Sequence, residues 1–272
     1  MSSGMQAASA AELGASQPAA WVIFPPGKLA HAGRLFLAGT LMVFVLGTIA
    51  GAAMPTFSVN LFAKLRAIYL APVGLAAKYV SVFAALILGN ALAAIIASSL
   101  GAAGTALLAR LHERDESAPR DYGLLGRASY QIARSWCWLG GLVAPEVREA
   151  PSFGARSAAA ISVLAPRASG LLAGGVLGLH LAGALVQQWI PGVVGAVAGL
   201  FPHALFEFPA IALSVAVGLA LAEEISLHAS AGPRALGGRA LSLLASPSLR
   251  RTLGFVFALV LIGAALEVRA LP

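Results

Sequence analysis

Five long apolar stretches run through the chain, and polar or proline-rich segments separate them. Each stretch has at most one charged residue over roughly 20 positions, which is the length at which an α-helix crosses the hydrocarbon core of a bilayer. The pattern therefore predicts about five transmembrane helices. The predicted spans are residues 35–53, 79–100, 171–189, 203–222 and 252–267.

The remaining segments predict a tail, interfacial helices and loops. Residues 1–27 are rich in Ala and Ser and predict a mobile tail before a single transmembrane domain, residues 28–272. Residues 54–77 have apolar side chains at helical spacing, typical of an amphipathic helix that lies in the interface or re-enters the membrane. Residues 110–167 hold eight Arg and six acidic residues and predict a cytoplasmic loop, within which 122–142 has the pattern of an amphipathic surface helix.

Two observations leave the number of spans open. The apolar run from 79 to 108 exceeds one membrane thickness, so it forms one long tilted span, which we favour, or a span with a bent continuation at Gly101 and Gly104. A further crossing hidden near 100–140 would give six spans. Five spans place the two ends of the chain on opposite sides of the membrane, and six place them on the same side.

Composition supports the membrane assignment. Hydrophobic residues make up 59% of the 272 residues and charged residues 11%, whereas about 25% are charged in ordinary soluble domains. The mean hydropathy is +0.85, and so few charges would not cover the surface of a soluble domain. The single Cys137 allows no internal disulfide and no cysteine-based zinc site. The expected fold class is an all-α polytopic transmembrane helical bundle with interfacial amphipathic helices.

The distribution of basic residues predicts the orientation. With the N-terminus inside, fourteen of the eighteen Lys and Arg residues face the cytoplasm: Lys28 and Arg34 before the first span, and the twelve Arg of the loops at 110–167 and 223–251. The positive-inside rule therefore predicts a multi-pass protein of the cell membrane with a cytoplasmic N-terminus. The net charge of +7 indicates contact with anionic membrane lipid, and nucleic acid is not an expected partner.

Ionisable side chains stand among apolar ones in the predicted fourth span. His203 and Glu207 are four residues apart and share one helix face. Pro202 suits a first helical turn and Pro209 removes a hydrogen bond, so the stretch predicts a helix start, a His/Glu pair and a kink. A carboxylate at mid-membrane is a functional-site candidate, because inserting it there costs about 2.5–3.5 kcal/mol.

Two interpretations of the His203/Glu207 pair stay open. In the structural one, which we favour, Glu207 is protonated or paired and locks helix packing; in the other, the pair relays protons or cations. No metal site is predicted, because two ligands do not complete one. His180 and Asn90 lie near the centres of their spans and are expected to form interhelical hydrogen bonds, with a functional role only if they converge on Glu207.

Signatures of catalysis are absent from the sequence. It contains no P-loop and no Gly-x-Ser-x-Gly motif. We therefore expect no enzyme activity, no catalytic residue and no cofactor. The adjacent Glu223 and Glu224 predict a solvated helix end, and Gly174 and Gly178 offer a small-residue contact surface that is a weak signal for dimerisation.

The stretch 202–210 reads Pro-His-Ala-Leu-Phe-Glu-Phe-Pro-Ala. It resembles the hallmark of the stage II sporulation protein M family, which is Pro-His-Gly, two hydrophobic residues, Glu, a hydrophobic residue and Pro-Ala. Ala204 stands where the family usually has Gly. A Leu/Ile-rich last helix that ends near Glu267, and Asn90 in an early helix, also fit the family. The resemblance is good from about 168 to 270.

The resemblance implies an all-helical integral membrane protein. The namesake of the family works without known catalysis, as the membrane member of a complex that anchors cell-wall-degrading enzymes. The expected function is therefore a non-catalytic scaffold or accessory subunit of an envelope-associated complex, with protein partners or a second copy of the chain. The alternative is a permease-like subunit or ion-coupled transporter that uses the His203/Glu207 pair.

Overall fold

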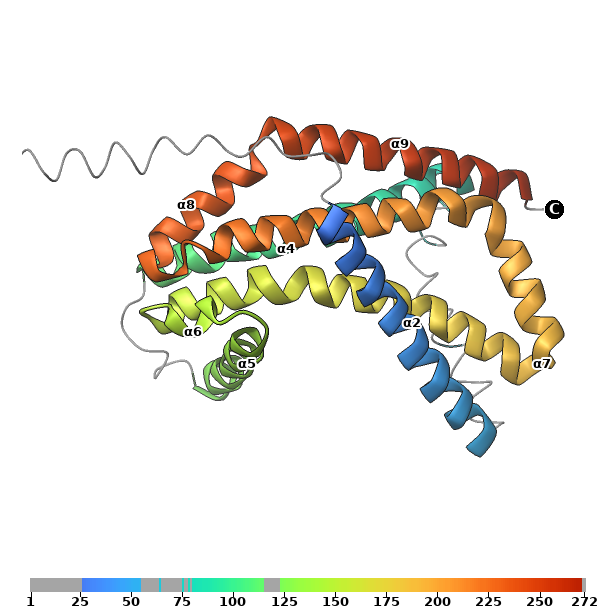
Figure 1. The fold of residues 1–272 in the computed structure, drawn as a ribbon, viewed down its shortest axis with the longest axis horizontal. Coiled ribbons are helices and arrows are strands. Elements are labelled where there is room, and N and C mark those ends of the chain that lie inside the picture. Colours follow the sequence, from blue (N-terminus) through green and yellow to red (C-terminus); the bar gives the residue numbers. More distant parts are fainter. Residues whose placement is uncertain are drawn as a thin grey trace, which may run out of the picture.

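A computed structural model describes residues 26–54, 80–114 and 123–270, with positions 64, 75 and 78 between them. Every regular element among these residues is helical, which confirms the all-α class. The predicted tail at 1–27 and the predicted interfacial helix at 54–77 lie, apart from a few positions, outside the described residues. The helices (Figure 1) are α2 (Pro26–Ala53), α4 (Val82–Arg114), α5 (Gly123–Val143), α6 (Glu146–Glu149), α7 (Phe153–Ser226), the short 3-10 helix η2 (Ala229–Ala231), α8 (Pro233–Leu244) and α9 (Pro247–Ala270).

Four of these helices, α2, α4, α7 and α9, are long and apolar enough to cross a membrane. Many of their large side chains lie on the outside of the bundle: Leu37 and Ile49 of α2 and Leu88 of α4 are more than half exposed. An apolar outer surface of this kind suits contact with lipid tails, which are as apolar as Leu. The chain is thus a polytopic membrane bundle.

The helix α7 contains both the third and the fourth predicted span. As one straight rod its 74 residues would extend about 110 Å, several times the thickness of a bilayer core. The helical angles break at Trp189, where φ is 56° and ψ is −150°, and the second half of α7 returns towards the start of the first half (Figure 1). The count of five crossings stays a prediction.

All the other described helices contact α7, which therefore forms the centre of the bundle. Its crossing with α2 depends on glycine. A Cβ atom on Gly174 would collide with the carbonyl oxygen of Phe36, and a Cβ atom on Gly178 with that of Thr40. Small residues let two helix backbones approach this closely, so the glycine surface of the third predicted span serves a contact within the chain.

The helix α4 packs along α7 as one continuous helix, without a bend at Gly101 or Gly104. Thr105 Oγ1 lies 2.8 Å from the Gly101 carbonyl oxygen of its own helix and 2.8 Å from the Ala158 carbonyl oxygen of α7. Both glycines face α7 at close range. Gly101 and Gly104 therefore serve helix packing, and α4 continues through both of them.

Much of the predicted loop at 110–167 is helical. The structure continues α4 to Arg114, forms α5, and starts α7 at Phe153, where the Ser152 side chain accepts a hydrogen bond from the Ala155 N–H at 3.1 Å. Charges and prolines suggested a loop, but Arg156 stays exposed while the alanines on the other faces of α7 are buried. An Ala-rich helix needs little space, so it packs closely even with charged neighbours in sequence.

The helix α5 corresponds to the amphipathic helix expected at 122–142. Its small residues face α7: a Cβ atom on Gly140 would lie 2.9 Å from the Ala160 Cβ. The Tyr130 and Phe153 rings also meet, with centroids 4.9 Å apart. Burial on this side raises the pKa of the Cys137 thiol above its usual value.

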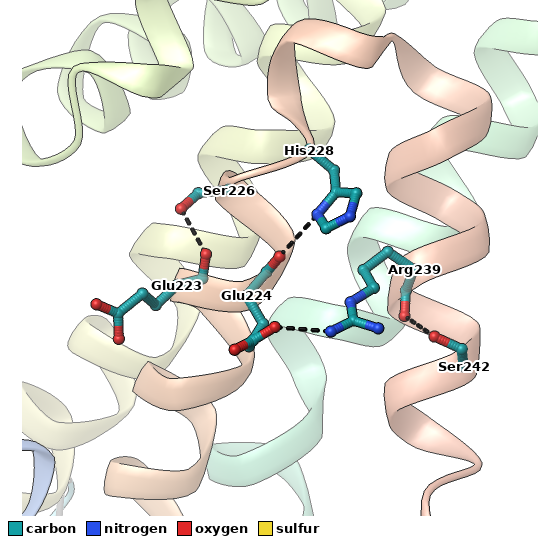
Figure 2. A network of polar contacts seen from close by, with 6 residues as sticks. All are labelled: Glu223, Glu224, Ser226, His228, Arg239 and Ser242. Carbon is teal, nitrogen blue, oxygen red and sulfur yellow. Dashed lines mark hydrogen bonds and ion pairs between the residues drawn. The ribbon is translucent and has the colours of Figure 1, made fainter. Parts of the chain in front are cut away.

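Polar contacts join the C-terminal end of α7 to α8 (Figure 2) and to α2. Arg239 Nη2 of α8 donates to Glu224 Oε2 at 2.7 Å, and His228 Nδ1 lies 3.1 Å from the Glu224 carbonyl oxygen. Glu223 forms an ion pair with Lys28 at the start of α2. The helix end at Glu223 and Glu224 was expected to be solvated. It is only partly solvated, because each of the two carboxylates pairs with a basic side chain of another helix.

Candidate functional site

His203 and Glu207 lie one turn apart on the second half of α7, as their spacing requires. His203 is only 8% exposed, and its Nδ1 is buried without a hydrogen-bond partner among the described residues. Glu207 is half-buried. The pair therefore faces protein, and most of the His203 ring is shielded from the outside of the bundle.

Asn90 of α4 reaches Glu207 across the helix interface. Asn90 Nδ2 donates a hydrogen bond to Glu207 Oε1 at 2.7 Å. A carboxamide that donates to a carboxylate restricts its rotation and leaves Glu207 Oε2 for another partner. The bond joins residues 117 positions apart, so it connects α4 directly to the His/Glu pair.

Glu267, in the last turns of α9, completes the group. One ligand atom each from His203, Glu207 and Glu267 lie within 4.8 Å of one another. Gly263, one turn before Glu267, makes room: a Cβ atom there would lie 2.8 Å from Glu207 Cγ. We call His203, Glu207, Glu267 and Asn90 the polar cluster.

The sequence did not predict that Glu267 belongs to this site. It reads as the polar end of the last span, and it is 60 positions from Glu207. One indication was present in the sequence: Gly263 and Glu267 are four residues apart, so a residue without a side chain and a carboxylate share one face of α9. That signal has no meaning until α9 is known to pack against the second half of α7.

Pro202 and Pro209 flank the cluster inside α7. Among the residues of α7 only Trp189 has non-helical angles, so no separate helix begins at 202, although the ribbon of α7 turns a second time between Trp189 and its long last segment (Figure 1). The kink expected at 209 stays a prediction. Pro in membrane helices is tolerated where neighbouring groups compensate for the missing hydrogen bond. His180 is exposed on the first half of α7 and does not join the cluster.

The charges of the cluster are not balanced by bases. The two ion pairs of Lys or Arg with Glu in the described part of the chain involve Glu223 and Glu224, about four turns further along α7. Glu207 and Glu267 therefore have Asn90 and His203 as their neighbours in the cluster. A cation placed between the two carboxylates would be attracted by both.

The chemistry of the cluster follows from these donors and acceptors. It offers one imidazole nitrogen and carboxylate oxygens from two helices, and all of these bind protons or metal cations. The site is therefore suited to binding a proton or a metal cation.

The apolar helices and the polar cluster between them define a multi-pass membrane protein. The family model described as Stage II sporulation protein M matches residues 136–269. The similarity to that family, which the stretch 202–210 predicted, therefore extends over residues 136–269, just under half of the chain. No curated protein and no solved structure matches the chain.

The matched range covers the end of α5 and almost all of α6 to α9. It includes His203, Glu207 and Glu267, whereas Asn90 lies outside it. Three members of the polar cluster thus belong to the family domain, and the fourth is supplied by the N-terminal part of the chain.

Proposed function

We propose that the chain is a non-catalytic scaffold or accessory subunit of an envelope-associated complex in the cell membrane. The family supports a role in assembly, and the observation that carries the proposal is the outer face of α5. Its partner is a protein that docks on this face, and membrane lipid surrounds the other helices.

The outer face of α5 is apolar and aromatic. Trp138 is 65% exposed, and Leu139 and Leu142, its neighbours on the helix surface, are exposed as well. The face lies on a helix outside the four that are able to cross a membrane. Trp is enriched among the residues that dominate binding energy at protein interfaces, so this face has the composition of a docking surface.

The packing of α5 keeps this face in a fixed position. Its main contacts are with α6 and α7, through Gly140 and the Tyr130–Phe153 ring pair. Arg134 is exposed on the same helix. A partner that presents apolar side chains with an acidic rim would match both features.

Photo-crosslinking tests this function in membranes. A photoreactive amino acid replaces Trp138, and the matched control replaces Leu37, which is exposed on the membrane-spanning α2. We expect a discrete protein adduct at position 138 that a Leu142→Ala substitution weakens, and lipid adducts alone at position 37. Lipid adducts alone at both positions would contradict the docking role.

A permease-like subunit or ion-coupled transporter is the second candidate. The convergence of His203, Glu207 and Asn90 between membrane helices favours it, because ionisable residues inside a bundle often mark ion pathways. This function requires flux of a proton or cation across the membrane that depends on Glu207. The scaffold function requires none.

A further inference from the structure

We propose that His203, Glu207 and Glu267 form a binding site for a divalent transition-metal cation, with Zn²⁺ as the ion that fits the ligands best. The bound ion would connect the second half of α7 to the end of α9. This site goes beyond the scaffold function and does not depend on it.

The spacing of the ligand atoms suits a metal ion. One atom from each residue lies within 4.8 Å of the others. With bonds of about 2.0–2.1 Å, the ligand atoms of a tetrahedral zinc site are about 3.4 Å apart. Small side-chain rotations of the two glutamates close that difference, because both have three rotatable bonds while the His203 ring is held in the core.

The buried imidazole provides an independent indication of a ligand. His203 is more than nine-tenths buried, and its Nδ1 lacks a hydrogen-bond partner among the described residues. Buried polar atoms in native proteins are nearly always paired, and each exception requires an explanation. A metal ion bound to the His203 ring would satisfy this nitrogen directly, or hold the ring through the other one.

The charge of the site also calls for a cation. Glu207 and Glu267 have no Lys or Arg partner in the described part of the chain. A divalent ion would neutralise both carboxylates and remove their mutual repulsion.

The surroundings hold the ligands in place. Asn90 donates to Glu207 Oε1 at 2.7 Å, which leaves Oε2 to bind the ion. Gly263 gives Glu207 room beside α9. Groups that orient metal ligands in this way typically contribute about 10- to 100-fold to metal affinity, so Asn90 is a positioning residue for the site.

The donor set selects among metals. Ca²⁺ and Mg²⁺ prefer oxygen ligands alone, whereas an imidazole with carboxylates suits Zn²⁺ and its neighbours in the first transition row. Three protein ligands leave a fourth position for water. The site therefore binds Zn²⁺ in preference to Ca²⁺.

The test uses the full chain, purified in mild detergent without an affinity tag and stripped of metal. Bound zinc is counted by mass spectrometry after ZnCl₂ addition and gel filtration, and the melting temperature is followed against zinc concentration. The site variants are His203→Gln and Glu267→Gln. The matched controls are His180→Gln, on the exposed face of α7, and Glu149→Gln, on the exposed end of α6.

We expect one zinc per chain and a melting temperature that rises with zinc in the wild type and in both controls. Each site variant should lose the bound zinc, and Asn90→Ala should bind it about 10- to 100-fold more weakly. Cobalt substitution should produce visible absorption bands in the wild type but not in Glu267→Gln. These bands report coordination even if a variant loses stability.

Three results would overturn the site. They are no stoichiometric zinc in the wild type, zinc retained in both site variants, and a preference for Ca²⁺ over Zn²⁺. Since binding is measured on the isolated chain, its failure leaves crosslinking at Trp138 unaffected, and the two proposals are tested separately.

Discussion

Glu207 is the residue on which three helices meet. Asn90 of α4 donates to it, Gly263 of α9 makes room for it, and its own helix places His203 one turn away. A carboxylate is acceptable at such a position only if its oxygens have partners, because an unsatisfied buried polar group costs about 1–3 kcal/mol. The polar cluster therefore contributes to stability through Glu207 whether or not it also binds an ion.

The hydrogen bond between Asn90 and Glu207 can be measured by a double-mutant cycle. Asn90→Ala should lower the free energy of unfolding in detergent by about 1–3 kcal/mol, because it leaves a carboxylate oxygen unpaired. In a Glu207→Leu background the same substitution should have a much smaller effect. Equal losses in both backgrounds would show that Asn90 does not act through Glu207.

At the scale of elements, the bundle depends on how closely α7 approaches its neighbours. Gly174 and Gly178 bring α7 against the backbone of α2. The rings of Phe36 and Phe208, with centroids 5.2 Å apart, connect α2 to the second half of α7. Helices in lipid gain little from apolar burial, so this close contact is the main source of their association.

Two glycines of α7 offer a matched comparison of this contact. Gly174→Ala places a methyl group against a backbone carbonyl that has no way to move aside, so we expect a loss of about 1–3 kcal/mol in unfolding free energy. Gly199 has open space around it. Gly199→Ala should be neutral, or should stabilise the protein by up to about 1 kcal/mol. Thermal unfolding of both variants checks the difference, and similar behaviour would contradict the packing described for Gly174.

The sequence predicted the membrane helices because a long apolar run has one physical interpretation. It predicted two of their ends, because the spans expected at 35–53 and 171–189 stop where α2 ends and where the angles of α7 break at Trp189. It did not predict where α7 begins. The Ala-rich start of α7 near Ala158 read as part of a charged loop, although a helix buries its small residues and exposes Arg156.

The candidate site was partly predictable for a similar reason. His203 and Glu207 share a helix face by spacing alone, so their proximity follows from the sequence. Asn90 was identified as a polar residue inside a span, but its contact with Glu207 depends on how α4 packs on α7. Glu267 depends on a third helix. Contacts between distant residues are set by helix packing, which single-sequence patterns do not contain.

At the scale of the whole molecule, the polar groups gather at two places. Lys28, Glu223, Glu224 and Arg239 join α2, α7 and α8 at the C-terminal end of α7, and Figure 2 shows the contact between Glu224 and Arg239. The polar cluster lies about four turns earlier in α7, beside the last turns of α9. With the N-terminus in the cytoplasm, which we propose, the ion pairs face the cytoplasm and the cluster lies toward the outside.

Cysteine labelling tests this orientation. The native Cys137 is first replaced by Ser, so that the introduced cysteines are the ones that report. Ser242→Cys on α8 and Arg269→Cys at the end of α9 are then introduced at exposed positions. A membrane-impermeant maleimide added to intact cells should label position 269 and should reach position 242 only after the membrane is opened. The reverse pattern would contradict a cytoplasmic N-terminus with five spans, and equal labelling of both positions would contradict the single crossing by α9.

Ion flux through the purified protein in liposomes tests the central claim most directly, because it separates a scaffold from a transporter. Proton and Zn²⁺ flux are compared for the wild type and Glu207→Gln, which keeps the shape of the side chain and removes its charge. The scaffold predicts no flux above that of empty liposomes for either protein, with both folding normally. Flux in the wild type that is lost in Glu207→Gln would contradict the scaffold and establish the transporter.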